Sequence, residues 1–306
     1  MRRAALALAA LAAGSATGAP GNLWHAQVDN DVAFHTDRWY TSGVRIYRST
    51  PAEGDSPFAA FLRLPSARPY RIDVGLVHEV HTGDGRADPA RVDRPNAARL
   101  LLSVARHDLG PDLLATWEVD AGVSGPAALG RQTQEAIHRI APAPATDWSH
   151  QVANRADLQV AGAWSRRFGP KALPGSLVIH GGAVAGTLVA FGHAGIEWRS
   201  ESPAQAPNAL LRYAATPPLP RTTHGWSFFG GAGVRAVARN RLLERRDDDP
   251  RTEAAHRRGV ARLAVGLAWS GPWGEVALGL AQDSREFEGQ QAPHRFGSLT
   301  VSLPVD

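Results

Sequence analysis

The sequence contains no cysteine and only one methionine, and Lys171 is its single lysine. Without cysteine there is no disulfide, no thiolate metal ligand and no thiol nucleophile, so any catalytic group must be of another kind. The 33 basic residues barely exceed the 29 acidic ones, which leaves a formal net charge of +4. This small excess gives no support to a nucleic-acid-binding function.

Long apolar runs are also absent from the body of the chain. The best candidate, residues 177–191, is interrupted by His180 and by glycines, which excludes a membrane-spanning helix. Only the start differs, because Arg2 and Arg3 precede an Ala/Leu stretch and a run of small residues. This order is typical of a secretory signal peptide. We therefore expect residues 1–19 to be removed and residues 20–306 to act outside the cytoplasm.

A period of two dominates the remaining sequence. In residues 113–123, for example, apolar side chains at odd positions alternate with mostly polar or small ones. About twelve such segments can be placed; they are residues 23–32, 41–49, 70–77, 98–105, 113–123, 151–166, 175–184, 187–198, 225–240, 255–269, 273–282 and 298–305. Long polar connections at residues 200–224 and 243–253 separate some of them.

This pattern predicts an all-β fold, an antiparallel transmembrane β-barrel of about twelve strands in a bacterial outer membrane, with short turns at one end and long loops at the other. A soluble periplasmic sandwich or barrel would show the same alternation. The second face of many segments carries Gly, Ser, Arg, Asp or Glu, which favours the membrane barrel. The last residue, Asp306, is not the terminal aromatic usual in such barrels.

Oxygen-bearing side chains gather where the first two predicted strands meet. Residues 29–31 and, after a short gap, residues 37–43 hold three carboxylates, an amide and two aliphatic hydroxyls, from Asp29, Asn30, Asp31, Asp37, Thr41 and Ser42. Such a group suits a hard cation such as calcium, although Asp-Asn-Asp runs also occur in ordinary turns.

A second cluster breaks the strand pattern at residues 127–140 and predicts a short helix, with Pro126 suited to its first turn. Gln134 and His138 are four residues apart, so they share one face of that helix. A histidine beside an amide can act as a general base next to an oxyanion-stabilising group. A packed or surface histidine is the simpler alternative.

Taken together, these motifs resemble the outer-membrane lipid A 3′-O-deacylase family. Their order and spacing match over residues 23–154, while the later half matches only in its barrel-like character. The matching elements are Asn30-Asp31, Asp37-Arg38-x-Tyr40-Thr41-x-Gly43, Asp93-Arg94-Pro95, Gly125-Pro126, Gln134-x-x-x-His138 and Trp148-x-x-Gln151-x-x-Asn154.

The resemblance implies a twelve-stranded barrel that removes the 3′-linked acyloxyacyl chain from lipid A by calcium-dependent hydrolysis, at a site between the barrel wall and a loop helix. By that resemblance His138 is the general base that activates water, and Asn30 and Asp31 shape the calcium site. Thr41 and Gln134 order the site and the developing oxyanion. No serine acyl-enzyme is implied, and the sequence has no G-x-S-x-G elbow.

The chain departs from the family pattern at three places. A basic residue after the third strand is expected to assist, and here only Arg86 or Arg91 is available. Asn96 replaces the usual aromatic after Asp-Arg-Pro, and residues 141–146 lack the acidic residue sometimes found after the histidine.

Three functions follow as alternatives: a lipid A hydrolase, a calcium-dependent phospholipase with the same chemistry, and a non-catalytic structural or solute barrel. The expected partners are lipopolysaccharide or lipid A and the outer-membrane lipids, with no nucleic acid. No oligomer surface is evident in the sequence, so a monomer is expected.

Overall fold

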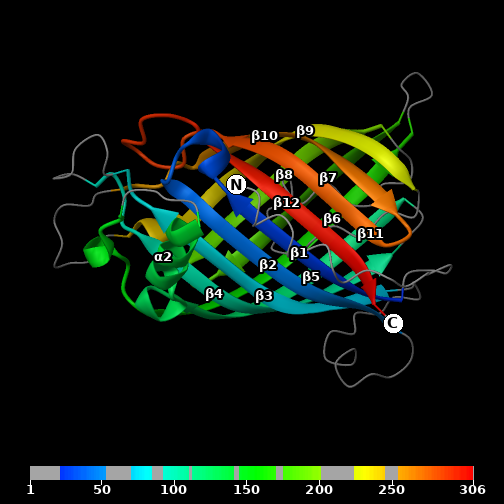
Figure 1. Cartoon of the computed structure of the whole chain (residues 1–306). Helices are drawn as coiled ribbons and strands as arrows, with labels where there is room; N and C mark the ends of the chain where they lie inside the picture. Colours follow the sequence, from blue (N-terminus) through cyan, green and yellow to red (C-terminus); the bar gives the residue numbers. More distant parts are fainter. Residues whose placement is uncertain are drawn as a thin grey trace.

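The computed structural model describes residues 21–52, 70–84, 92–109, 112–140, 145–169, 175–200, 224–244 and 254–305. Within these residues twelve antiparallel strands form one closed sheet, because β1 pairs with β12 as well as with β2 (Figure 1). The strands are β1 (Asn22–Asn30), β2 (Trp39–Ala52), β3 (Tyr70–Thr82), β4 (Ala97–Leu109), β5 (Leu113–Ser124), β6 (Arg155–Phe168), β7 (Ser176–Gly186), β8 (Val189–Arg199), β9 (Gly225–Asn240), β10 (Gly259–Gly271), β11 (Gly274–Asp283) and β12 (His294–Val305). The prediction of a twelve-stranded antiparallel barrel is confirmed.

The alternation along the strands separates an apolar outer face from a polar lumen. Side chains that point outward include Val28, Leu76 and Leu102, which are 44%, 54% and 53% exposed. Their neighbours along the strands point inward and are buried, although many are charged, such as Asp29 and Arg99. An apolar exterior around a polar interior is the distribution of a transmembrane barrel and the reverse of that in a soluble sandwich.

Ion pairs between nearby strands line the inner face of the barrel. Arg45 contacts Asp29 at 3.0 Å and Glu79 at 2.7 Å, which ties β1, β2 and β3 together. Arg99 on β4 contacts Asp157 on β6 at 2.7 Å. Tyr47, Val77 and Leu101 form a small apolar cluster between such pairs. Charged side chains on the inward face of these strands are thus paired with each other from strand to strand.

The pair between Arg99 and Asp157 gives a stability prediction. We expect Arg99→Leu to lower the free energy of unfolding by roughly 3–5 kcal/mol, because it leaves the buried Asp157 carboxylate without its cation. Urea unfolding of the protein in detergent, followed by tryptophan fluorescence, measures this loss. The double variant Arg99→Leu/Asp157→Leu should recover most of it, and equal midpoints for the single and double variants would contradict this explanation.

The end of the barrel at which a connection lies depends on whether it follows an odd- or an even-numbered strand. Residues 187–188 link β7 to β8 at the end opposite the start of β1, whereas β8 ends and β9 begins at the end where β1 starts and β12 ends. The prediction that all long connections lie at one end is therefore wrong. The expected signal peptide, residues 1–19, lies outside the described residues.

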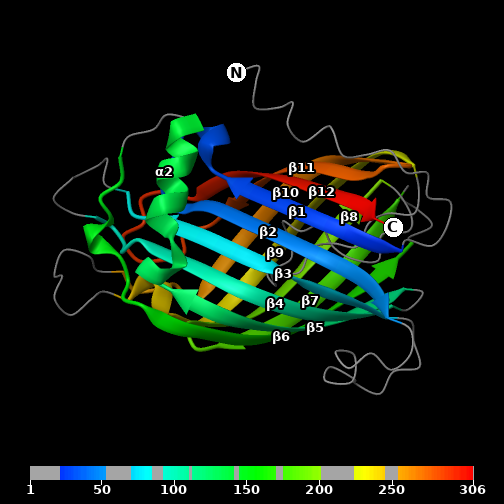
Figure 2. The same cartoon turned by 60° about the horizontal axis from the view of Figure 1, so that its bottom comes forward.

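The loop between β5 and β6 carries α2 (Gly130–Ile140), close to the expected helix at residues 127–140. Figure 2 shows α2 beside the outer wall, at the end of the barrel opposite the start of β1 and the end of β12. No helix in the described part of the chain is long and apolar enough to cross a membrane.

Candidate active site on the outer wall

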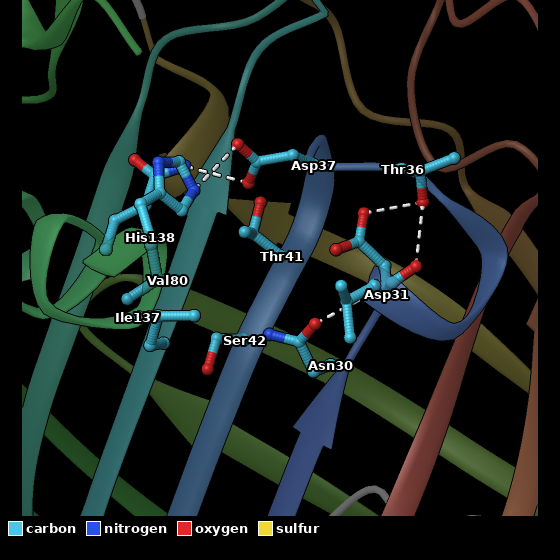
Figure 3. A pocket seen from close by; sticks show the side chains of 11 residues that line it. Asn30, Asp31, Thr36, Asp37, Thr41, Ser42, Val80, Ile137 and His138 are labelled. Atoms are coloured by element: carbon cyan, nitrogen blue, oxygen red, sulfur yellow. Dashed lines mark hydrogen bonds and ion pairs between the residues drawn. The ribbon is translucent and has the colours of Figure 1, made fainter. Parts of the chain in front are cut away.

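A pocket lies on the outside of the barrel, at the ends of β1, β2 and β3 (Figure 3). Asn30 pairs with Ser42 and Ser42 pairs with Val80, so these three side chains share one face of the sheet. It is the outward face, because Val28 and Leu76 have the same parity. The pocket is lined by Asn30, Asp31, Val32, Thr36, Asp37, Thr41, Ser42, Val80, Gln134, Ile137 and His138.

All five residues singled out from the sequence thus line this pocket, namely Asn30, Asp31, Thr41, Gln134 and His138. They come from β1, β2, the loop between these strands, and α2. The two arginines considered as assisting residues, Arg86 and Arg91, lie outside the described residues.

Close packing holds α2 against the wall. Pro126 begins the short 3-10 helix η2 (Pro126–Ala128), which leads into α2, and the Ala128 carbonyl lies 2.7 Å from His78 Nε2 on β3. Gly130, at the start of α2, faces Ala98 of β4 and the ring of Trp148. The helix covers Val80, which is only 1% exposed on an otherwise open face. Gln134 and His138 consequently face the pocket.

The fit at Gly130 predicts a specific disruption. A Cβ atom there would lie 2.5 Å from Ala98 Cβ and 2.7 Å from the Trp148 ring, so Gly130→Leu should displace α2 from the wall. We expect faster tryptic cleavage at Arg131 and Arg139, while the barrel itself stays folded. The control is Ala136→Leu on the exposed side of α2. Equal cleavage of both variants would contradict this packing.

His138 is held by a carboxylate. Its Nε2 lies 3.1 Å from Asp37 Oδ2, and the other oxygen, Oδ1, accepts a hydrogen bond of 2.8 Å from Gln134 Nε2. When the imidazole is neutral, its Nε2–H donates to Asp37, which leaves Nδ1 with a free lone pair. No described residue bonds to Nδ1. The arrangement therefore presents a base whose tautomer and orientation are set by Asp37.

The Thr41 hydroxyl uses its proton within the protein and keeps its lone pairs free. β2 is bulged between Tyr40 and Ser42, and the Thr41 hydroxyl lies 2.6 Å from that of Thr82. Because the Thr82 hydroxyl donates to the Asp37 carbonyl at 3.2 Å, its single proton is used, and Thr41 is then the donor to Thr82. The lone pairs of Thr41 remain available to the pocket, which suits a cation better than an anion.

Asp31 is a buried carboxylate at the start of the short 3-10 helix η1 (Val32–Phe34). Its Oδ2 accepts hydrogen bonds of 2.7 Å from the Thr36 hydroxyl and 3.0 Å from the Arg38 amide. No basic side chain of the described residues forms an ion pair with it. Burial raises the pKa of Asp31 to about 7, against the opposing effect of these hydrogen bonds.

The donor chemistry around Asp31 fits a hard cation. Asp31 Oδ1 accepts no hydrogen bond from a described residue, and Asn30 and Thr41 add neutral oxygens beside it. The described residues contain no cluster of three or more His, Cys, Asp or Glu side chains arranged for a metal. Calcium tolerates a single carboxylate when amide, carbonyl, hydroxyl and water oxygens complete its shell. The observation that supports the fit is that the buried Asp31 carboxylate has no basic side chain beside it in the described part of the chain.

Several supporting contacts could not be read from the sequence. Asp93 accepts from the Asp84 amide at 2.7 Å and from Trp39 Nε1 at 2.8 Å, and it thereby fastens the strand ends beside the pocket. Trp39 has a φ of 64°, which is rare for a bulky residue, and its ring is packed edge-on against Phe287. The Asp-Arg-Pro motif was the only sequence signal for this fastening.

Comparisons with known proteins agree with this architecture. A family model described as outer membrane protein LpxR matches residues 3–305. LpxR from Salmonella typhimurium has a similar structure, with a TM-score of 0.71 at 20% identity, covering 93% of this chain and 100% of that chain. The translocator domain of the autotransporter NalP from Neisseria meningitidis gives a TM-score of 0.45 at 11% identity, covering 94% of this chain and 90% of that chain. A search of curated proteins found no match.

Proposed function

The chain belongs to the LpxR family of outer membrane proteins, and we propose that it is a calcium-dependent ester hydrolase that removes the 3′-linked acyloxyacyl chain from lipid A. The carrying observation is the pairing of His138 with Asp37 in the same outer-wall pocket as the buried Asp31. A base and a candidate cation site facing one cleft are the elements that metal-assisted ester hydrolysis requires.

His138 is the proposed general base. Water held at Nδ1 transfers a proton to the imidazole as its oxygen bonds to the ester carbonyl carbon. Asp37 stabilises the imidazolium that forms, since its Oδ2 already faces Nε2 at 3.1 Å. The imidazolium then returns the proton to the departing sugar oxygen as the carbon–oxygen bond breaks, which yields a free acid and a 3′-hydroxyl.

Asn30 and Asp31 are the proposed calcium-binding residues, and Thr41 adds an oxygen with free lone pairs. When bound, calcium supplies Lewis-acid polarisation of the ester carbonyl. Gln134 orders the site through Asp37, because both ends of its amide are engaged by the protein.

The outer-wall location supports a membrane lipid as the substrate. Immediately below the pocket, Val28 and Val44 form one cross-strand pair, and Ile46 and Leu76 form another, all on the outward face. In an outer-membrane barrel this face contacts the hydrocarbon of the bilayer. An acyl chain lying along the wall would thus bring its ester link to the level of His138.

The lumen gives no support to a solute channel. The ion pairs of Arg45 and Arg99 join nearby strands along its inner wall, and the described pocket opens outward rather than into it.

The test uses the purified protein in detergent with lipopolysaccharide and with glycerophospholipid, each with calcium or with a chelator. Mass spectrometry of released acyl chains is expected to show calcium-dependent release from lipopolysaccharide. Release from glycerophospholipid alone would replace the proposed substrate by a phospholipid. Release from neither lipid would refute a hydrolase.

A further inference from the structure

Asn96 fastens a loop segment that the proposed mechanism does not use. This residue stands just before β4 and is 1% exposed. Its Oδ1 accepts from the Gly83 amide at 2.8 Å, and its Nδ2 donates to the Asp147 carbonyl at 2.8 Å. Its backbone also bonds to the same segment, through the His150 carbonyl and the Val152 amide. Residues 147–152 are therefore anchored to the barrel wall beside α2.

That segment carries Trp148 under α2. Trp148 begins the short 3-10 helix η3 (Trp148–His150), where Asp147 accepts a hydrogen bond from the Ser149 amide. The indole is 6% exposed, and its ring contacts Gly130 of α2. Its Nε1–H donates to Gln134 Oε1 at 2.8 Å.

This contact fixes which way the Gln134 amide points. An indole N–H is a donor only, so the amide oxygen must face Trp148. The amide nitrogen is then left to face the Asp37 carboxylate, to which it donates at 2.8 Å. Without the indole N–H, the buried amide oxygen has no donor among the described residues, so the Gln134 amide is held from the Asp37 side alone and the position of both groups is less fixed.

We propose that Trp148, held in place by Asn96, is a positioning residue that sets the Gln134 amide and, through it, the Asp37 carboxylate that orients His138. The order of contacts is Asn96, Trp148, Gln134, Asp37 and His138, each joined to the next by a hydrogen bond, an ion pair or the anchored segment. The inference rests on the proposed function, since it concerns the same base. The proposal also assigns a role to Asn96, which stands where the family has an aromatic residue.

Trp148→Phe tests the hydrogen bond while keeping an aromatic ring under α2. We expect kcat for lipid A hydrolysis to fall about tenfold, because a buried acceptor loses its donor and the base loses its alignment. KM and the urea midpoint should stay close to those of the wild type, which a purely structural role of the ring does not predict. The matched control is Trp117→Phe on the lipid-facing wall of β5, 48% exposed and remote from the site.

A double-mutant cycle with Gln134→Leu tests whether Trp148 acts on His138 through Gln134. Once Gln134 has no polar end, Trp148→Phe should change kcat by less than about twofold. Full additivity of the two losses, or a Trp148→Phe enzyme with wild-type kcat, would overturn the proposal. A wild-type protein inactive on lipid A would instead refute the proposed function.

Asn96→Leu tests the anchor in the same assay. If the Asn96→Leu protein folds, its kcat should fall to a similar extent as that of Trp148→Phe. A kcat equal to that of the wild type would show that Asn96 is not part of this series of contacts. If this variant does not fold, the cycle between Trp148 and Gln134 decides the remaining proposal alone.

Discussion

His138→Ala is expected to reduce the hydrolysis of lipid A by about a hundred- to ten-thousand-fold, the usual contribution of a positioned general base. Among the described residues that line the pocket, His138 is the one imidazole, and Asp37 holds its ring through the contact of 3.1 Å to Nε2, which leaves the lone pair of Nδ1 free. Of the other titratable side chains in the pocket, Asp37 is engaged by Gln134 and His138, and Asp31, whose Oδ1 is free of described partners, is the proposed calcium ligand. With Asp31 assigned to the cation, His138 is the base that remains among the described residues that line the pocket.

The measurement is the release of acyl chains from lipopolysaccharide, followed by mass spectrometry at saturating calcium. Arg131→Ala is the matched control, because Arg131 lies on the same helix with its side chain 64% exposed and paired only with Glu135. Heat-modified mobility on gels checks that both variants form the barrel. Unchanged hydrolysis in His138→Ala would show that the attacking water is activated elsewhere.

Asp37→Asn separates orientation from basicity in the same assay. In this variant the side-chain amide at position 37 can either accept a hydrogen bond from Nε2–H of His138 or donate one to Nε2. The negative charge that selects the Nε2–H tautomer is gone, so both tautomers become possible. A loss in kcat nearly as large as that of His138→Ala follows if the carboxylate stabilises the imidazolium. A variant as active as the wild type would limit Asp37 to packing.

The strands were predictable because each of their two faces meets a chemically different environment. Residues 225–240 and 113–123 were placed within one residue of β9 and β5 from alternation alone. The prediction that all long connections lie at one end of the barrel was wrong. It used the length of each connection, but the end at which a connection lies depends on whether it follows an odd- or an even-numbered strand. In a closed antiparallel barrel of twelve strands, every even-numbered strand ends where β1 starts and β12 ends, and residues 200–224 follow β8.

The site was predictable only in part, because some of its residues are close in the sequence and others are brought together only by the fold. Asn30, Asp31 and Thr41 lie close together in the sequence, and Gln134 and His138 share a helical face, so local rules group each set. The contact between His138 and Asp37 depends on how α2 docks against the wall. That docking is set by Gly130, Ala98 and Trp148, which come from three separate segments, so no local pattern encodes it.

Removing calcium is expected to reduce lipid A hydrolysis to background, and Asp31→Asn is expected to raise the calcium concentration needed for half-maximal activity by at least about tenfold. Asp31 is the one carboxylate of the pocket whose Oδ1 no described residue engages, and the protein supplies no basic side chain to balance it there. An amide keeps the shape and the hydrogen-bonding oxygen but removes the negative charge, which contributes most to holding a hard cation.

Calcium binding must also be measured directly, by equilibrium dialysis of the purified protein, so that a loss of affinity is distinguished from a loss of chemistry. Asp112→Asn is the matched control, because Asp112 is paired with Arg167 at the opposite end of the barrel. His138→Ala should bind calcium like the wild type while remaining inactive, since its imidazole contacts Asp37 rather than Asp31. If Asp31→Asn bound calcium normally, the cation would have to lie elsewhere, and the buried carboxylate would need another partner.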